Sequence, residues 1–143
     1  MSKVPKEDIK IFREIRLVVE ELPDVEFGKG PDGEPIVISC HMLTRALAEY
    51  FPVKAKDGFM VNIWQHSWLE TKGGFIIDPY PIALVGGPIL VVAKDSPWGS
   101  FYKKYLHGSF PDLMQEPFLS QVKLLTKVMG DTIERIHLQL RSA

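Results

Sequence analysis

The sequence predicts an α+β fold in which an antiparallel sheet packs against helices from both ends of the chain. Apolar residues recur at helical spacing near each terminus, whereas short apolar and aromatic runs separated by glycine-containing turns occupy the middle. Strands and helices do not alternate as they do in a parallel α/β sheet. At 143 residues, we expect one domain spanning residues 1–143.

Charge and cysteine content narrow the class of protein. The net charge is −1, so no broad basic field favours binding to nucleic acid or to an anionic membrane surface. One cysteine cannot form an internal disulfide, which indicates a reducing compartment and predicts a cytoplasmic protein. The first residues are charged and predict no secretory signal. The nearly apolar run over 79–93 is too short to span a bilayer and is broken by proline and glycine.

The first predicted helix covers residues 5–22. Pro5 suits its first turn, and Pro23 ends it. Residues 24–35 are rich in glycine and proline and predict a loop. The apolar positions of the helix share one face: Ile9, Phe12, Ile15, Val19 and Leu22.

A second helix is predicted from about residue 40 to residue 51. Ser39 is a suitable N-cap, because its hydroxyl can accept from a backbone N–H of the first turn. Cys40 then occupies the first helical position, on the same apolar stripe as Leu43, which we expect to face the core. His41 falls on the next stripe round the helix.

Strands follow in the central part of the chain. The pattern predicts strands at 53–55 and 59–64, separated by a turn at Lys56-Asp57-Gly58. A β-hairpin is then expected, with arms at about 64–71 and 74–79 joined through the glycines that follow Lys72.

The last third of the chain is less regular. Residues 82–85 and 89–93 suit either two strands or a loop that covers a cleft, and both alternatives stay open. Residues 95–111 are predicted to be partly helical at most, and 117–141 form the second strongly periodic helix. Its apolar positions are Val122, Leu125, Met129, Ile133, Ile136 and Leu140.

Cys40 is a candidate nucleophile. The first turn of a helix has unpaired backbone N–H groups and a favourable dipole, and both lower the pKa of a thiol placed there. A cysteine on an apolar stripe is also a common buried packing residue, so Cys40 by itself does not indicate catalysis. A partner that can accept its proton is needed.

Four histidines could supply that base. His137 lies among polar residues of the C-terminal helix and is expected to face solvent, and His107 precedes a glycine in a loop. His41 adjoins Cys40, but one helical step turns a side chain by about 100°, so we do not expect it to reach the thiol. His66, on a predicted strand, remains as the base; its structural alternative is a half-buried residue bonded to a backbone carbonyl.

Asp78 would complete a triad if it meets His66 across the hairpin. A carboxylate at the end of a buried apolar run needs a partner, although Asp-Pro can also simply end a strand with a turn. A two-residue loop at 72–73 would place Ser67 opposite Asp78. A three-residue loop at 71–73 would place His66 directly opposite, and this register is the one that the triad predicts.

The order Cys40, His66-Ser67-Trp68 and Asp78-Pro79 resembles the transglutaminase-like superfamily of papain-like cysteine enzymes, whose core arylamine N-acetyltransferases share. The likeness covers about residues 36–80. It implies a cysteine-bearing helix packed on an antiparallel sheet that carries the histidine and aspartate. It also implies acyl transfer through a thioester, as hydrolysis, deamidation, transamidation or acetyl transfer, on an amide- or acyl-containing substrate such as a protein side chain. No cofactor is expected.

The chain departs from the family's pattern in its oxyanion donor. Members often supply Gln or Trp upstream of the cysteine, but residues 1–38 contain no Gln, Asn, Trp, Tyr, His or Thr. The candidates that remain are the backbone N–H of Cys40 and the side chains of Asn62, Trp64 and Trp68.

Two alternatives to a cysteine enzyme fit the same residues. A catalytically inactive binding module on the same fold would explain the missing upstream donor. A metal site of Cys40, His41, His66 and Asp78 is the other, but one cysteine beside one histidine is not a zinc-binding spacing. Nucleotide binding has little support, since no glycine-rich loop opens a helix after a strand in the required pattern.

Overall fold

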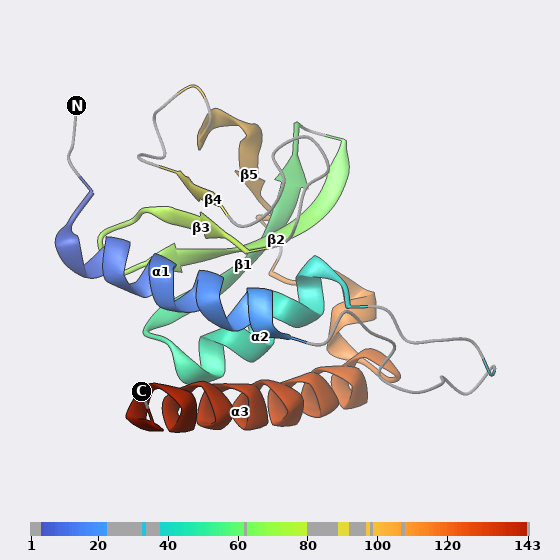
Figure 1. Cartoon of the computed structure of the whole chain (residues 1–143). Coiled ribbons are helices and arrows are strands. Elements are labelled where there is room, and N and C mark those ends of the chain that lie inside the picture. Colours follow the sequence, from blue (N-terminus) through green and yellow to red (C-terminus); the bar gives the residue numbers. More distant parts are fainter. Residues whose placement is uncertain are drawn as a thin grey trace.

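The fold is α+β in the computed structural model of the chain (Figure 1). The structure describes residues 4–22, 33, 38–61, 63–79, 89–91, 97, 99–106 and 108–142. Within these ranges no helix combines the length and the apolar character needed to cross a bilayer.

Three α-helices confirm the three that the periodicity predicts. They are α1 (Lys6–Glu21), α2 (Cys40–Tyr50) and α3 (Phe118–Ser142). The start of α2 is set by Ser39, whose hydroxyl accepts from the backbone N–H of Met42 at 3.2 Å. Cys40 is therefore fixed at the first helical position.

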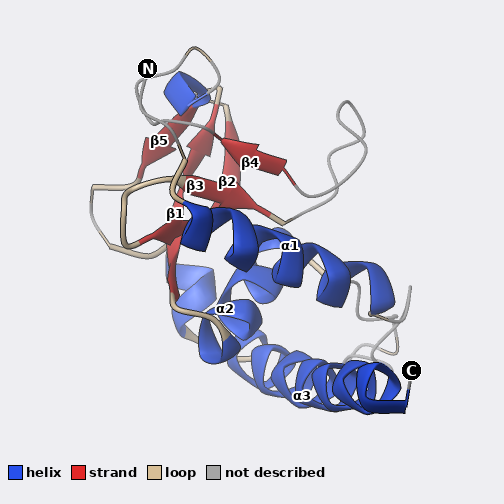
Figure 2. Cartoon of the chain, turned by 60° about the vertical axis from the view of Figure 1, so that its left-hand side comes forward, coloured by secondary structure: helices blue, strands red, loops and turns tan. Residues whose placement is uncertain are grey.

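The strands form one antiparallel sheet in the order β4-β3-β2-β1-β5. Figure 2 shows the sheet on one side and the three helices gathered on the other. The strands are β1 (Val53–Met60), β2 (Trp64–Thr71), β3 (Ile76–Asp78), β4 (Ile89–Val91) and β5 (Tyr102–Lys104).

The first strand corrects the prediction of two strands divided by a turn. β1 runs unbroken through Asp57 and Gly58 and pairs with β2 along its whole length. Gly58 is a close-packing residue here, because a Cβ would overlap the carbonyl oxygen of Lys103 on β5 and the ring of Trp68. A glycine inside a strand therefore indicates close approach of a neighbouring strand in this sheet.

Other differences lie after the hairpin. β5 and a short 3₁₀ turn (Gly99–Phe101) lie in the region 95–111, predicted to be partly helical at most, and a second 3₁₀ turn (Pro111–Met114) follows it. β4 agrees with the strand alternative for 89–93, whereas residues 82–85 lie outside the described residues.

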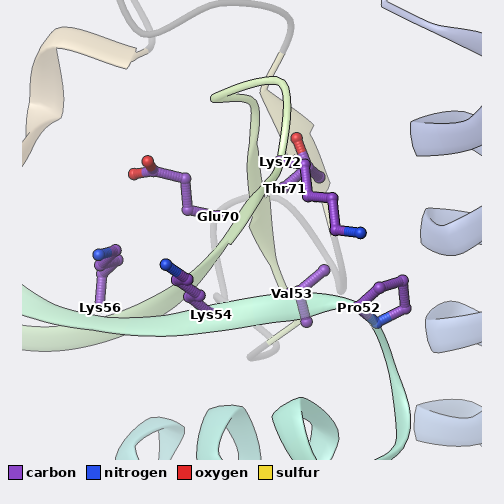
Figure 3. A pocket seen from close by; sticks show the side chains of 7 residues that line it. All are labelled: Pro52, Val53, Lys54, Lys56, Glu70, Thr71 and Lys72. Carbon is purple, nitrogen blue, oxygen red and sulfur yellow. The ribbon is translucent and has the colours of Figure 1, made fainter.

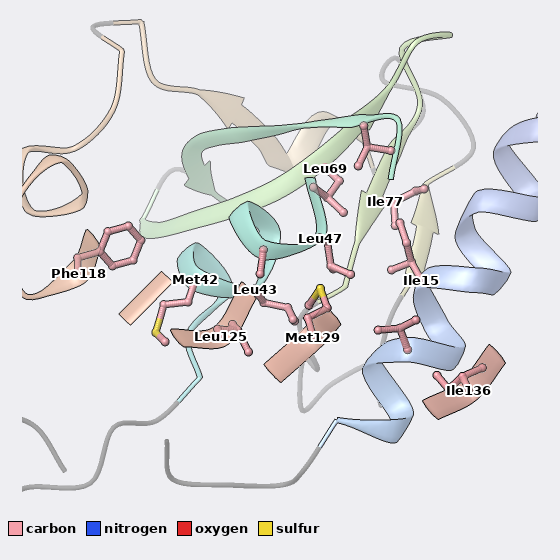
Figure 4. Close-up of a cluster of buried hydrophobic side chains, with 13 residues drawn as sticks. Ile15, Met42, Leu43, Leu47, Leu69, Ile77, Phe118, Leu125, Met129 and Ile136 are labelled. Atoms are coloured by element: carbon pink, nitrogen blue, oxygen red, sulfur yellow. The ribbon is translucent and has the colours of Figure 1, made fainter. Parts of the chain in front are cut away.

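The apolar core lies between the sheet and the helices (Figure 4). Figure 4 shows Leu43 and Leu47 of α2 between Leu69 of β2 and Met129 of α3. Burial of this seam fixes α2 against the sheet, and with it the position of Cys40. The buried members are Ile15, Val18, Met42, Leu43, Ala46, Leu47, Val53, Leu69, Ile77, Phe118, Leu125, Met129 and Ile136.

The hairpin between β2 and β3 has a three-residue loop, but not the predicted one. Thr71 N–H donates to the Phe75 carbonyl at 2.9 Å, so the loop is residues 72–74. Gly74 has φ +87°, the left-handed conformation that this loop type places at its last position. Leu69 pairs with Ile77, so the predicted direct pairing of residue 66 with residue 78 is wrong. The offset is an even number of residues, which leaves both side chains on the same face.

Candidate active site

Cys40 begins α2 and is buried, with 8% of its surface exposed. The imidazoles of His41 and His66 lie close enough to its thiol to lower the pKa of that group. Because α2 packs on β1 and β2, the helix start and the strand that carries His66 are held in fixed relation. The structure thus brings the predicted cysteine and histidine together.

His66 is bound in turn by Asp78. Nε2 of His66 lies 2.7 Å from Oδ2 of Asp78, and both residues are buried. The same carboxylate oxygen accepts from the hydroxyl of Tyr102 on β5 at 2.8 Å. A diagonal rather than direct cross-strand relation is sufficient for this contact, because His66 and Asp78 share a face of the sheet. These hydrogen bonds from His66 and Tyr102 offset the free-energy cost of burying the carboxylate of Asp78.

Aromatic rings support the imidazole of His66. The ring of Trp68 stacks on it at a centroid distance of 6.2 Å, and Tyr102 packs edge-on against Trp68 at 5.2 Å. These contacts leave His66 little rotational freedom, so the orientation of its ring is set by packing as well as by Asp78.

The charges of the site oppose the effect of its burial. Burial acts to raise the pKa of Cys40, but hydrogen bonds to His41 and His66 and the charges of both outweigh it and lower the pKa to about 6. Burial acts to lower the pKa of His66, but the bonds to Asp78 and Cys40 raise it to about 9. Between these values the thiolate and imidazolium forms coexist as an ion pair.

His41 acts on the thiol, because its imidazole lowers the pKa of Cys40, although helical spacing predicts a side chain that points away from it. Its Nδ1 lies 2.6 Å from Oγ of Ser67 on β2, and its ring contacts Phe110 edge-on. Helical spacing gives the direction of a side chain as it leaves the backbone. The hydrogen bond to Ser67 then fixes the ring of His41 between the first turn of α2 and β2.

Ser67 connects His41 to an ion pair. The hydroxyl of Ser67 donates to Oδ1 of Asp57 at 2.6 Å, and Arg45 of α2 binds both oxygens of Asp57 at 3.0 and 2.6 Å. Ser109 donates to Oδ2 at 2.6 Å. Burial acts to raise the pKa of Asp57, but Arg45 and the two serines outweigh it and lower the pKa. Asp57 is therefore an ionised carboxylate at neutral pH.

The oxyanion candidates are not all near the thiol. Trp64 opens β2 with 61% of its surface exposed, so it lies largely in solvent. Trp68 is buried against His66, and its indole N–H has no hydrogen-bond partner within the part of the chain that the structure describes. Asn62 lies outside the described residues. The backbone N–H of Cys40 lies in the first helical turn, where such groups lack intrahelical partners.

The two remaining histidines lie elsewhere. His137 is exposed on α3, as predicted, and His107 lies outside the described residues. Among the residues described, no three His, Cys, Asp or Glu side chains gather into a group that could hold a metal ion.

A hollow of about 480 Å³ lies along β1 and β2 (Figure 3). Its charged lining consists of three lysines and one glutamate, and Figure 3 shows Lys54 and Lys56 side by side on β1. None of the triad residues lines it. The lining residues are Pro52, Val53, Lys54, Lys56, Glu70, Thr71 and Lys72.

Comparison of the chain with models of known protein families, with curated proteins and with solved structures finds no match. Any account of function therefore depends on the residues and their geometry.

Sequence reasoning missed Tyr102 and the chain of contacts behind His41. Tyr102 comes from β5, a three-residue strand whose pattern is too short to predict. The ion pair between Arg45 and Asp57 could not be predicted, because the sequence around Asp57 predicts a turn. A usable signal existed: Arg45 lies four residues after His41, on the same helix face.

Proposed function

We propose that the chain is a cysteine-dependent acyl-transfer enzyme that forms a thioester on Cys40. The observation that carries the proposal is the buried chain Cys40–His66–Asp78, in which an imidazole bound by a carboxylate contacts a thiol at a helix start. The α+β architecture, with the cysteine helix packed on an antiparallel sheet, supports a transglutaminase-like core.

Each residue of the Cys40–His66–Asp78 triad has a defined role in the proposal. His66 holds Cys40 as a thiolate, because Asp78 stabilises the imidazolium that results. Asp78 accepts from Nε2 of His66, which leaves Nδ1 to face the sulfur. Tyr102 keeps Asp78 in place through its second hydrogen bond.

The reaction would begin with attack of the thiolate on the carbonyl carbon of an amide or other acyl group. The carbonyl oxygen becomes an oxyanion, for which the backbone N–H of Cys40 at the start of α2 is a candidate donor. Collapse of this intermediate breaks the bond to the leaving group, which takes a proton from the imidazolium of His66, and leaves the acyl group on Cys40. Water or an amine then attacks the thioester, gives its proton to the neutral His66 and regenerates the thiolate.

The test is acetylation of Cys40 by p-nitrophenyl acetate, followed by intact-protein mass spectrometry. The wild-type protein should gain one acetyl group that hydroxylamine removes, and Cys40→Ala should gain none. His66→Ala should slow acetylation at pH 7 on the order of 10²-fold, the usual contribution of a positioned base. His137→Ala is the matched control and should react at the wild-type rate.

Two results would contradict the proposal. One is a wild-type rate no higher than that of a simple thiol, and the other is a His66→Ala rate equal to that of wild type. Either would favour a non-catalytic binding module on the same fold.

A further inference from the structure

A second pocket, of about 550 Å³, lies beside the proposed triad. Trp68 and Tyr102 line this pocket, and each also contacts a triad residue. The ring of Trp68 stacks on that of His66, and the hydroxyl of Tyr102 donates to Asp78 at 2.8 Å. Pockets that hold small molecules have volumes of about 300–1,000 Å³, so this one is large enough for a ligand.

The indole N–H of Trp68 is a buried donor without an acceptor. Trp68 has 1% of its surface exposed, and no atom in the described ranges accepts a hydrogen bond from its Nε1. The rest of the ring is closely packed. It stacks on His66 and meets Tyr102 edge-on, and its Cη2 would lie 2.6 Å from a Cβ on Gly58. Leaving a buried donor unpaired costs free energy, which an acceptor supplied by a ligand would offset.

The remainder of the lining favours an uncharged ligand. Ile76 joins the two aromatic residues in an apolar cluster that is separate from the main core. Nζ of Lys104 lies 3.0 Å from Oε2 of Glu70, so this ammonium group and this carboxylate neutralise each other. Lys103 precedes Lys104 on β5, and the alternation of a strand directs its side chain to the opposite face of the sheet. The described lining therefore combines apolar surface with one unpaired donor.

We propose that this pocket binds an uncharged apolar amide, whose carbonyl oxygen accepts a hydrogen bond from Nε1 of Trp68. The carbonyl supplies the acceptor that the indole lacks, and an aryl or alkyl substituent contacts Ile76 and the aromatic rings. This inference goes beyond the proposed function, because binding here involves neither the thiol of Cys40 nor a reaction. The bound molecule would contact the two side chains that hold His66 and Asp78 in place.

The test compares two probe compounds that differ only at the carbonyl. Acetanilide and N-ethylaniline share a phenyl ring, an N–H group and a two-carbon substituent, and both are uncharged at pH 7. Acetanilide alone carries the carbonyl oxygen. It should bind on the order of tenfold more tightly than N-ethylaniline, because only acetanilide satisfies the indole N–H.

Nuclear magnetic resonance of the ¹⁵N-labelled full chain reports on this N–H group directly. The indole signal of Trp68 is identified as the one that Trp68→Phe removes. Titration with acetanilide should move this proton signal downfield until it saturates, as expected for a new hydrogen bond. The indole of Trp64, which is 61% exposed, provides the control in the same spectrum and should stay in place.

Two variants separate the hydrogen bond from the apolar contacts. Trp68→Phe keeps an aromatic ring but removes the donor, so the two compounds should bind it equally, as measured from the backbone amide signals of residues 102–104. Leu106→Ala should weaken both compounds by a similar factor and keep their ratio. Leu106 lines the pocket and is 90% exposed, so its replacement should not disturb folding. Leu119→Ala, exposed on α3, is the matched control.

Three results would overturn the proposal. If acetanilide leaves the Trp68 signal unmoved, water alone satisfies the indole N–H. Equal affinity of wild type for the two compounds would show that the carbonyl is not recognised. Unchanged affinities in Leu106→Ala would show that the compounds bind outside this pocket. None of these results depends on whether Cys40 is catalytic.

Discussion

The two imidazoles that act on Cys40 come from different elements and are bonded to different groups. His66 lies on β2 and is backed directly by Asp78, which is fully buried and is held by Tyr102. His41 lies on α2 and is backed by Ser67, with Asp57 and Arg45 behind it. Both series of contacts lead to a carboxylate: Asp78 bonds His66 directly, whereas the hydroxyl of Ser67 stands between His41 and Asp57, which is paired with Arg45. The direct carboxylate contact is one of the causes that raise the pKa of His66 to about 9.

The largest expected effect comes from removing the charge behind His66. Asp78→Asn keeps an acceptor for Nε2 but no longer stabilises the imidazolium, so the pKa of His66 falls and that of Cys40 rises. Alkylation of Cys40 by iodoacetamide at pH 7 should slow on the order of tenfold, since a tenfold loss of thiolate corresponds to one pKa unit. Asp131→Asn, exposed on α3, is the control. An unchanged alkylation rate in Asp78→Asn would show that Asp78 does not stabilise the His66 imidazolium.

The pH dependence of the free energy of unfolding should report on the proton that Cys40 and His66 share. His66 has a raised pKa, so its contribution is complete below its ordinary value of 6.5 and is lost as pH rises through about 9. Cys40 has a lowered pKa, so its contribution is complete above 9.0 and is lost as pH falls through about 6. Between about 6.5 and 9 the two slopes have opposite signs and cancel in the wild-type protein.

Removing the thiol should expose the slope of His66 alone. In Cys40→Ala, Asp78 still raises the pKa of His66, so the free energy of unfolding should fall as pH rises above about 6.5, by up to about 1.4 kcal/mol per pH unit. Urea unfolding at about pH 6.5, 7.5 and 8.5 measures the difference between variant and wild type. A difference that stays constant with pH would contradict a proton shared between Cys40 and His66.

The two carboxylates should also differ in how the loss of a hydroxyl donor affects the free energy of unfolding. Tyr102→Phe leaves the fully buried Asp78 with one fewer donor and should lower the free energy of unfolding by about 1–3 kcal/mol. Ser109→Ala removes a donor from Asp57, which keeps Arg45, and should cost less than about 1 kcal/mol. Equal losses would mean that Arg45 does not compensate for the missing donor.

The sequence predicts the elements and the members of the triad because their signals are local. The helices at 5–22, 40–51 and 117–141 follow from apolar periodicity, and Ser39 marks the helix start at Cys40. The hairpin follows from its glycines, but three-residue loops at 71–73 and 72–74 satisfy the same composition. Which glycine takes the positive φ depends on packing, and the structure places Gly74 there.

The rest of the site depends on contacts between distant strands. Asp57 resembles a turn residue beside Gly58, and only the approach of β5 shows that this glycine belongs inside a strand. The role of Tyr102 depends on the strand order β3-β2-β1-β5. Its hydroxyl comes from β5 and reaches Asp78 of β3. Helical spacing alone predicts that His41 points away from the thiol. Spacing gives only the direction in which a side chain leaves the backbone, and it does not include the contact with Ser67 on β2 or the effect of His41 on the pKa of Cys40.

The central claim is that Cys40 is a thiolate at neutral pH because imidazoles hold its negative charge. Since Cys40 is the only cysteine in the chain, the rate of iodoacetamide alkylation as a function of pH reports on it alone. The account predicts an inflection near pH 6 in the wild-type protein, shifted toward the ordinary thiol value of 9.0 in His66→Ala. A single inflection near 9.0 in both proteins would contradict it.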